Sequence, residues 1–216
     1  MKRAGVERGR APPREVRIIG GQWKRSKLPV ADVAGLRPTP DRVRETLFNW
    51  LGQTLDGWRC LDAFAGSGAL GFEAASRGAA EVVLLERDRH LVRSLADSAQ
   101  RLKATGLRAE CADAIPWMAR AAPSSFDLVF LDPPFDSDLG GPALAAAARI
   151  IAANGWIYVE QGRPLEGAAL PAGLAVVRQG RAGAVHFHLL RRSAGDPDGR
   201  SAAGPAPSPA PSPAPV

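Results

Sequence analysis

Short apolar runs alternate with helical stretches through the middle of the chain, and this alternation constrains the fold more than any other feature. The runs are WRCLDAF (58–64), EVVLLE (81–86), LRAECA (107–112) and FDLVFLD (126–132). Each precedes a segment with helical features, at 69–76, 89–103, 115–119 and 139–153. Strands that are apolar along their length are typical of a parallel sheet buried on both faces, and parallel neighbours need a crossover helix. The sequence therefore predicts a Rossmann-like α/β domain with a mostly parallel sheet.

The remaining segments complete this domain and flank it. Predicted strands at 155–160, 174–179 and 184–190 close the sheet, and the short turn QGRAG predicts that the last two form an antiparallel hairpin at its edge. Earlier in the chain, VRIIGG and KLPV predict a basic hairpin, and Thr39 is placed to cap a helix that starts at Pro40. We expect four segments: a disordered basic arm (1–14), the basic hairpin and helix (15–57), the Rossmann-like domain (58–192) and a disordered Ala/Pro/Ser-rich tail (193–216).

Positive charge is concentrated at the start of the chain. Residues 1–59 hold 13 Lys and Arg against 6 Asp and Glu, whereas the remaining residues hold 15 against 16. A basic segment on a near-neutral domain favours a polyanionic partner, with nucleic acid first and an anionic membrane surface second; a solvated tail that aids solubility explains the charge equally well. The sequence has no membrane-spanning apolar stretch, no signal-peptide core and only two cysteines, so we expect a cytoplasmic protein.

A glycine-rich turn follows the first strand of the domain, in the segment CLDAFAGSGALG (60–71). Gly66 and Gly68 permit a tight turn and close approach by a ligand, and Gly71 permits close packing of the next helix on the strand. The spacing alone is weak evidence, since a tight turn without a ligand has the same pattern. Asp62 is more specific, because a carboxylate at the strand's carboxyl end disfavours pyrophosphate and suits a cation. S-adenosylmethionine, with its sulfonium and ammonium groups, is such a ligand.

Acidic residues at later strand ends extend the predicted cofactor site. Glu86 lies 20 residues after Gly66, where a carboxylate can accept hydrogen bonds from both ribose hydroxyls, and we favour this role over a simple exposed strand-end acid. Asp113 can accept a hydrogen bond from the adenine amino group, although capping of the following helix explains it equally well. The predicted cofactor-binding residues are Asp62, Phe64, Gly66, Gly68, Glu86 and Asp113.

The segment Asp132-Pro133-Pro134-Phe135 directly follows the fourth strand, at the sheet edge where ligands bind, and is the predicted catalytic segment. An exocyclic base amine is a weak nucleophile, because its lone pair is delocalised into the ring. The Asp132 carboxylate and the Pro133 carbonyl can accept its two N–H bonds and favour the positive charge that develops on nitrogen. The prolines hold that carbonyl outward, and Phe135 can stack on a base taken out of its helix. No strong general base is needed, since the methylated ammonium loses its proton easily.

Four segments together resemble one protein family. RIIGGQWKRSKLPV (17–30), LRPTPDRVRETLFNWL (36–51), CLDAFAGSGALGFEA (60–74) and DPPF (132–135) resemble, in this order, the RsmD family of bacterial 16S rRNA guanine-N2 methyltransferases. The resemblance spans about residues 15–192, and the first two segments are its most specific part; the family usually has a second Thr in place of Pro40. It implies a class I S-adenosylmethionine-dependent methyltransferase fold and methylation of the exocyclic N2 amine of the guanine at position 966 of 16S rRNA.

The resemblance also implies a substrate partner, 16S rRNA within an assembling 30S subunit, bound by a monomeric protein. The implied nucleic-acid-binding residues are Arg17, Trp23, Lys24, Arg25, Lys27, Arg37 and Arg42, and a half-buried position in the hairpin explains Trp23 about equally well. The RPTPDRVRE segment is expected over the cofactor and the target pocket, with Arg37, Thr39, Arg42 and Arg44 near the ligand, unless Arg44 is simply a surface residue of the helix. We expect no metal, because the three histidines lack metal-ligand spacing.

Other functions share some of these features. A DNA adenine-N6 methyltransferase also uses an acidic or amide residue before Pro-Pro-aromatic, but this chain has no added domain for reading a DNA sequence. The intact Asp62, Glu86 and DPPF segment argue against a non-catalytic nucleic-acid-binding module. A nicotinamide dehydrogenase is opposed by Asp62 and by the DPPF segment.

Overall fold

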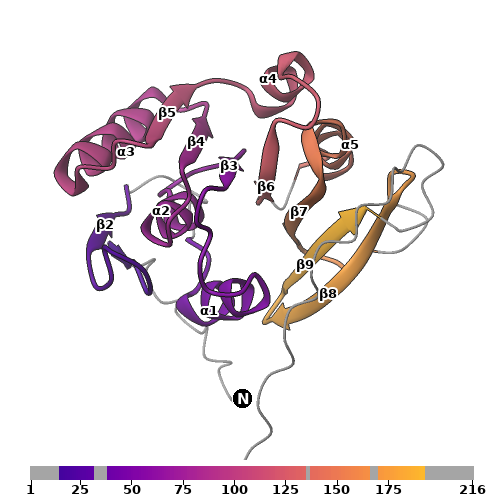
Figure 1. Ribbon diagram of the computed structural model, residues 1–216, viewed down its shortest axis with the longest axis horizontal. Helices are drawn as coiled ribbons and strands as arrows, with labels where there is room; N and C mark the ends of the chain where they lie inside the picture. Colours follow the sequence, from indigo (N-terminus) through magenta and orange to yellow (C-terminus); the bar gives the residue numbers. More distant parts are fainter. Residues whose placement is uncertain (1–14, 32–37, 135–136, 166–169, 193–216) are drawn as a thin grey trace, which may run out of the picture.

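A computed structural model describes residues 15–31, 38–134, 137–165 and 170–192. Its centre is a seven-stranded sheet with the order β5-β4-β3-β6-β7-β9-β8 (Figure 1). The strands are β3 (Arg59–Asp62), β4 (Glu81–Glu86), β5 (Leu107–Cys111), β6 (Phe126–Leu131), β7 (Ile151–Gln161), β8 (Leu174–Ala182) and β9 (Val185–Arg192). Strands β3 to β7 pair in parallel, and β9 runs antiparallel between β7 and β8. The predicted Rossmann-like sheet with an antiparallel edge hairpin is confirmed.

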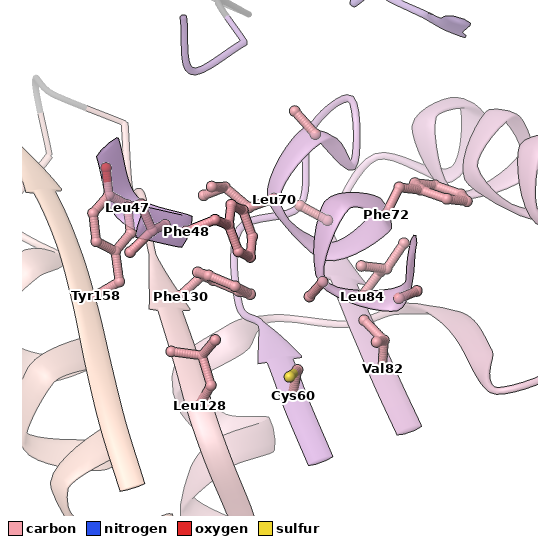
Figure 2. Packing of buried hydrophobic residues seen from close by; sticks show 14 of the residues in the cluster. Leu47, Phe48, Cys60, Leu70, Phe72, Val82, Leu84, Leu128, Phe130 and Tyr158 are labelled. Atoms are coloured by element: carbon pink, nitrogen blue, oxygen red, sulfur yellow. The ribbon is translucent and has the colours of Figure 1, made fainter. Parts of the chain in front are cut away.

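Helices cover both faces of this sheet. The helices α1 (Asp41–Trp50), α2 (Ala69–Ser76) and α3 (Arg89–Leu102) pack on one face, and α4 (Ala114–Arg120) and α5 (Gly140–Ile150) pack on the other (Figure 1). Between the first layer and the sheet, the rings of Phe48 and Phe130 lie 6.3 Å apart, and Phe130 meets Tyr158 edge-on (Figure 2). Within the described parts of the chain, no helix is both long enough and apolar enough to cross a membrane.

The direction of chain progression through the sheet reverses between β3 and β6. The chain runs from β3 outward to β4 and β5, and then returns to β6 on the other side of β3. The connections on the two sides leave the sheet over opposite faces, and this opens a crevice beyond the carboxyl ends of β3 and β6.

Two predicted element boundaries are wrong. The helix predicted over 139–153 ends at Ile150, because Ile151 pairs with Phe126 and β7 continues beyond it through a register shift. Pairing with a buried strand outweighs the helical propensity of this Ala-rich segment. Thr39 does not cap α1: Pro40 is the N-cap residue, no side chain caps the helix, and the Pro40 carbonyl accepts the first helical N–H bonds.

The predicted basic hairpin is present with shorter strands. It consists of β1 (Glu15–Arg17) and β2 (Lys27–Pro29), which pair antiparallel. The inward side chains of Val16 and Leu28 are buried in the hydrophobic cluster that also contains α1 and α2 residues. In the loop that joins the two strands, the N–H groups of Ile19 and Gly20 each donate to the Glu73 carboxylate at 2.8 Å.

Glu73 of α2 is fully buried and collects donors from three segments of the chain. Besides the two backbone N–H groups, Arg44 of α1 donates to it at 3.1 Å and Arg77 donates at 2.8 Å. Arg44 is itself fully buried and also donates to the carbonyls of Arg17 and Thr39. The sequence led us to expect Arg44 either near the ligand or on the helix surface. Both expectations are wrong, because its side chain is buried and does not line the crevice beyond β3 and β6. It links the hairpin and the start of α1 to α2.

We expect Glu73→Gln to lower the free energy of unfolding by about 3–5 kcal/mol, because the substitution leaves two arginines near the core without their shared anion. Urea denaturation followed by circular dichroism measures this change. Glu15→Gln is the matched control, since it removes an exposed ion pair with Lys27 and should change the stability by less than about 1 kcal/mol. Equal, small changes for the two variants would contradict the proposed role of Glu73.

Candidate active site

A cleft of about 330 Å³ lies in the crevice at the carboxyl ends of β3, β4 and β6. It brings together most of the predicted cofactor and catalytic residues. Those that line it are Asp62, Phe64, Gly66, Glu86, Asp113, Asp132, Pro133 and Pro134. The predicted Gly68 begins α2 beside this lining, and Phe135 lies outside the described residues.

Asp62 ends β3 at the floor of the cleft and is 2% exposed. One of its oxygens accepts a hydrogen bond from the Gly71 N–H at 3.0 Å. Burial raises the pKa of this carboxyl to about 7, and the nearby Glu86 carboxylate adds to the shift. Burial therefore disfavours the ionised form of Asp62, and a bound cation would favour it.

The glycine-rich turn has the backbone geometry that its residues predict. Gly66 and Gly68 have φ values of 51° and 77°, in the left-handed region that favours glycine. A Cβ atom on Gly71 would lie 2.1 Å from Leu84 Cδ2, so α2 packs on the sheet at a distance that only glycine permits. Asp62, the turn and the start of α2 are thus one compact unit beneath the cleft.

Glu86 ends β4 and is oriented by three backbone donors. Its carboxylate accepts hydrogen bonds from the N–H groups of Gly66 at 3.1 Å, Arg87 at 2.7 Å and Asp88 at 2.9 Å. Asp113 caps α4 through a 3.4 Å bond from the Ile115 N–H, and it also lines the cleft. The capping role of Asp113 is therefore present, and its contact with an adenine stays a prediction.

Asp132 directly follows β6 and is partly buried at the cleft. No residue of the described chain donates a hydrogen bond to its carboxylate. Burial raises the pKa of Asp132 well above its usual value, and the negative charges of Glu160 and Asp62 raise it further. Pro133 is buried, while the Pro134 carbonyl accepts hydrogen bonds from the backbone and hydroxyl of Ser137. The Asp132 carboxylate is thus a hydrogen-bond acceptor that lines the cleft without a donor among the described residues.

Sequence reasoning missed Glu160. It lies near the carboxyl end of β7 and is 2% exposed, and it accepts a hydrogen bond from the Tyr158 hydroxyl at 2.9 Å. Thr39, which lines the cleft, lies near enough to Glu160 to lower its pKa. The available signal was its position: like Asp62 and Asp132, it is an acid at the end of an apolar strand, in GWIYVE.

The sequence and the fold match known proteins closely. The family model described as Conserved hypothetical protein 95 matches residues 16–191. The chain is 43% identical over 186 residues to Ribosomal RNA small subunit methyltransferase D of Escherichia coli K12, which covers 83% of this chain and 91% of that protein. The chain belongs to the RsmD family.

Further relatives and solved structures agree with this RsmD assignment. Ribosomal RNA small subunit methyltransferase D of Haemophilus influenzae is 41% identical over 188 residues, 82% of this chain and 94% of that protein. The structure of the putative methyltransferase yhhF from Escherichia coli has a TM-score of 0.74 and 42% identity, covering 83% of this chain and 99% of that one. The putative methylase HI0767 from Haemophilus influenzae has a TM-score of 0.68 and 35% identity, covering 82% and 98%. The predicted class I methyltransferase fold is confirmed.

The basic side chains implied by the RsmD resemblance lie largely on the surface. Arg17, Lys24, Arg25, Lys27 and Arg42 are exposed, and Lys27 forms an ion pair with Glu15 at 2.7 Å. Trp23 is half-buried and packs against the cluster beneath the hairpin, and its backbone N–H donates to the Ser76 hydroxyl. Arg37 lies outside the described residues. Contact of these side chains with RNA stays a prediction.

We expect Gly68→Ala to lower the free energy of unfolding by about 2–4 kcal/mol, because its Cβ would lie 2.6 Å from Leu95 in a left-handed backbone conformation. Chemical denaturation measures the change. Gly52→Ala is the matched control: its φ is also positive, at 92°, but a Cβ there meets no atom within 4 Å. The control should change the stability by only about 1–2 kcal/mol. Equal losses would mean that backbone strain alone, and not packing, requires glycine at position 68.

Proposed function

We propose that this protein transfers the methyl group of S-adenosylmethionine to the exocyclic N2 amine of a guanine in 16S rRNA. The observation that carries the proposal is the Asp132 carboxylate, an acceptor that faces a cleft also lined by Asp62, Gly66 and Glu86. Membership of a family whose Escherichia coli and Haemophilus influenzae relatives are named Ribosomal RNA small subunit methyltransferase D supports the substrate class.

The acidic lining of the cleft fits a cationic cofactor. Asp62 would face the positively charged end of the molecule, and Glu86, held by its backbone donors, would accept hydrogen bonds from the ribose. The remaining cofactor contacts are assigned to Phe64, Gly66, Gly68 and Asp113. When bound, S-adenosylmethionine supplies a methyl group on a sulfonium, which is open to displacement by a nitrogen nucleophile.

The segment Asp132-Pro133-Pro134-Phe135 would hold the target amine for this displacement. The Asp132 carboxylate accepts one N–H bond and the Pro133 carbonyl accepts the other, and both favour the positive charge that nitrogen gains. Phe135 stacks on the flipped base. The exposed Arg17, Lys24, Arg25, Lys27 and Arg42, together with Trp23 and Arg37, bind the RNA around it, mainly through phosphates.

The proposed function is tested by supplying labelled S-adenosylmethionine together with 30S subunits from a strain that lacks the endogenous activity. Mapping of the label by mass spectrometry should place it on the exocyclic nitrogen of guanine 966. Parallel reactions with naked 16S rRNA separate an assembled from an unassembled substrate. Label on adenine N6 of duplex DNA, with none on rRNA, would refute the proposal.

We expect Asp132→Ala to reduce the transfer rate by roughly 100- to 1000-fold, because the amine loses a charged acceptor that acts as positive charge develops. Single-turnover kinetics with 30S subunits measure the rate, and calorimetry should find cofactor binding retained. Asp127→Asn is the control, since this residue lies near the amino end of the same strand and pairs with Arg59. Normal turnover by Asp132→Ala would remove Asp132 from the mechanism.

The affinity for S-adenosylmethionine should depend on pH through Asp62. Because the pKa of this buried carboxyl is raised to about 7, it is protonated and neutral below that pH and must ionise to pair with a cation. We therefore expect the dissociation constant to fall as the pH rises toward 7, by up to about tenfold per pH unit, and to level off above. Calorimetry in two buffers with different ionisation enthalpies counts the released proton. Asp62→Asn should bind more weakly and with a flatter pH dependence; a wild-type affinity that does not change with pH would contradict this assignment.

A further inference from the structure

A second carboxylate lies directly beside the catalytic one. The parallel register of β6 and β7 pairs Leu131 with Val159, so the next residues, Asp132 and Glu160, follow side by side at the carboxyl ends of these strands. Two positions earlier on the same face, Phe130 and Tyr158 meet edge-on with ring centroids 6.3 Å apart. Asp132 and Glu160 therefore continue one line of paired positions from the core toward the cleft, which Asp132 lines.

Glu160 is held in place from the sheet. The Tyr158 hydroxyl donates to its Oε1 at 2.9 Å, and the ring of Tyr158 lies in the aromatic cluster of the core (Figure 2). Thr39, which lines the cleft, lies near enough to Glu160 to lower its pKa, and the Arg44 side chain donates to the Thr39 carbonyl at 3.2 Å. A buried carboxylate with the Tyr158 donor has a defined orientation beside the position of Asp132.

The charged and titratable groups around this pair come from four elements. Three of them act on Glu160: Asp132 after β6, Tyr158 on β7 itself and Arg44 on α1. On β9, the residue paired with Glu160 is the apolar Phe187. Asp62 of β3 completes the negative surroundings of Asp132. Burial raises the pKa of Glu160, and its hydrogen bond from Tyr158, the nearby Thr39 and the charge of Arg44 oppose that rise. The ionised form of Glu160 thus has specific stabilising partners, whereas the charged groups that act on Asp132 are the acids Glu160 and Asp62.

We propose that Glu160 is a positioning residue for the methyl transfer: its carboxylate, held by the Tyr158 hydroxyl, keeps the neighbouring Asp132 carboxylate turned toward the incoming amine. This inference rests on the proposed function. In that reaction the amine nitrogen gains a bond to the methyl carbon as the carbon–sulfur bond breaks, with the electron pair remaining on sulfur. The nitrogen then loses one proton to water. The negative charge of Glu160 adds to that of Asp132 where nitrogen becomes positive, in a partly buried site where charges interact strongly.

The test is the pH dependence of the single-turnover rate with 30S subunits. In the wild-type protein, the acid limb reports the ionisation of the carboxyl pair. Glu160→Gln keeps the size and polarity of the side chain but removes the charge that raises the pKa of Asp132. We expect the limb to move to lower pH by about one unit and the plateau rate to fall roughly 10- to 100-fold, as with other outer-layer partners of reactive groups.

Tyr158→Phe should move the acid limb in the opposite direction. This variant keeps the aromatic packing but removes the donor that stabilises ionised Glu160, so the pair should protonate at a higher pH than in the wild type. Glu81→Gln is the matched control, because it is the same change at the amino end of β4, away from the carboxyl ends that form the cleft, and should leave the rate profile unchanged.

The inference is overturned if Glu160→Gln retains the wild-type limb and plateau, or if it lowers only the thermal stability. An altered stability with an unshifted limb would identify Glu160 as a purely structural residue. A wild-type protein that methylates no rRNA refutes the proposed function, and this inference with it. Transfer by the wild type with an unshifted limb in Glu160→Gln refutes the inference alone.

Discussion

The buried Glu73 carboxylate is the interaction on which the arrangement of the site depends. It accepts hydrogen bonds from the backbone after β1, from Arg44 of α1 and from Arg77 of its own helix. The helix that carries it begins at the glycine-rich turn, so a single side chain connects the cofactor side of the cleft to the basic hairpin. The hairpin forms a separate two-stranded sheet, and α1 is a helix, so neither is joined to the central sheet by strand pairing. This ion-pair network, together with apolar burial, therefore holds them in place.

A cleft with several buried carboxylates is an unfavourable place to ionise. Asp62, Asp132 and Glu160 lie at the ends of neighbouring strands. Burial raises the pKa of all three carboxyls, and the charges of nearby acids raise those of Asp62 and Asp132 further. A structure selected only for stability would replace some of these acids with apolar or amide side chains. Their presence together is understandable if a cationic ligand and a nitrogen that becomes positive occupy the cleft, since both stabilise the ionised carboxyls.

Much of the fold and part of the site could be predicted from local sequence. The apolar runs predicted the strands, because burial on both faces leaves no polar alternation, and Asp62 and Asp132 stood out as acids that directly follow such runs. What could not be predicted depended on tertiary partners. Arg44 looks like a surface residue until its partner Glu73, 29 positions away in the sequence, is placed beside it, and Thr39 looks like a helix cap until the fold places it near the buried Glu160. The Ala-rich end of the predicted helix at 139–153 became strand because β6 offered it a pairing edge.

A continuous set of contacts joins the predicted RNA-binding surface to the predicted catalytic carboxylate. Arg44 donates to the carbonyl of Arg17 at the end of β1 and to that of Thr39 at the cleft, and Thr39 lies near Glu160, which is beside Asp132. Both hydrogen bonds come from a buried guanidinium, so the end of the hairpin strand and Thr39 cannot move independently without leaving a buried polar atom unpaired. In the proposed function, a large RNA that docks on the hairpin would therefore meet a cleft whose geometry relative to that hairpin is already fixed. Positioning of this kind is what a weakly nucleophilic amine requires, because its reaction depends on alignment more than on proton removal.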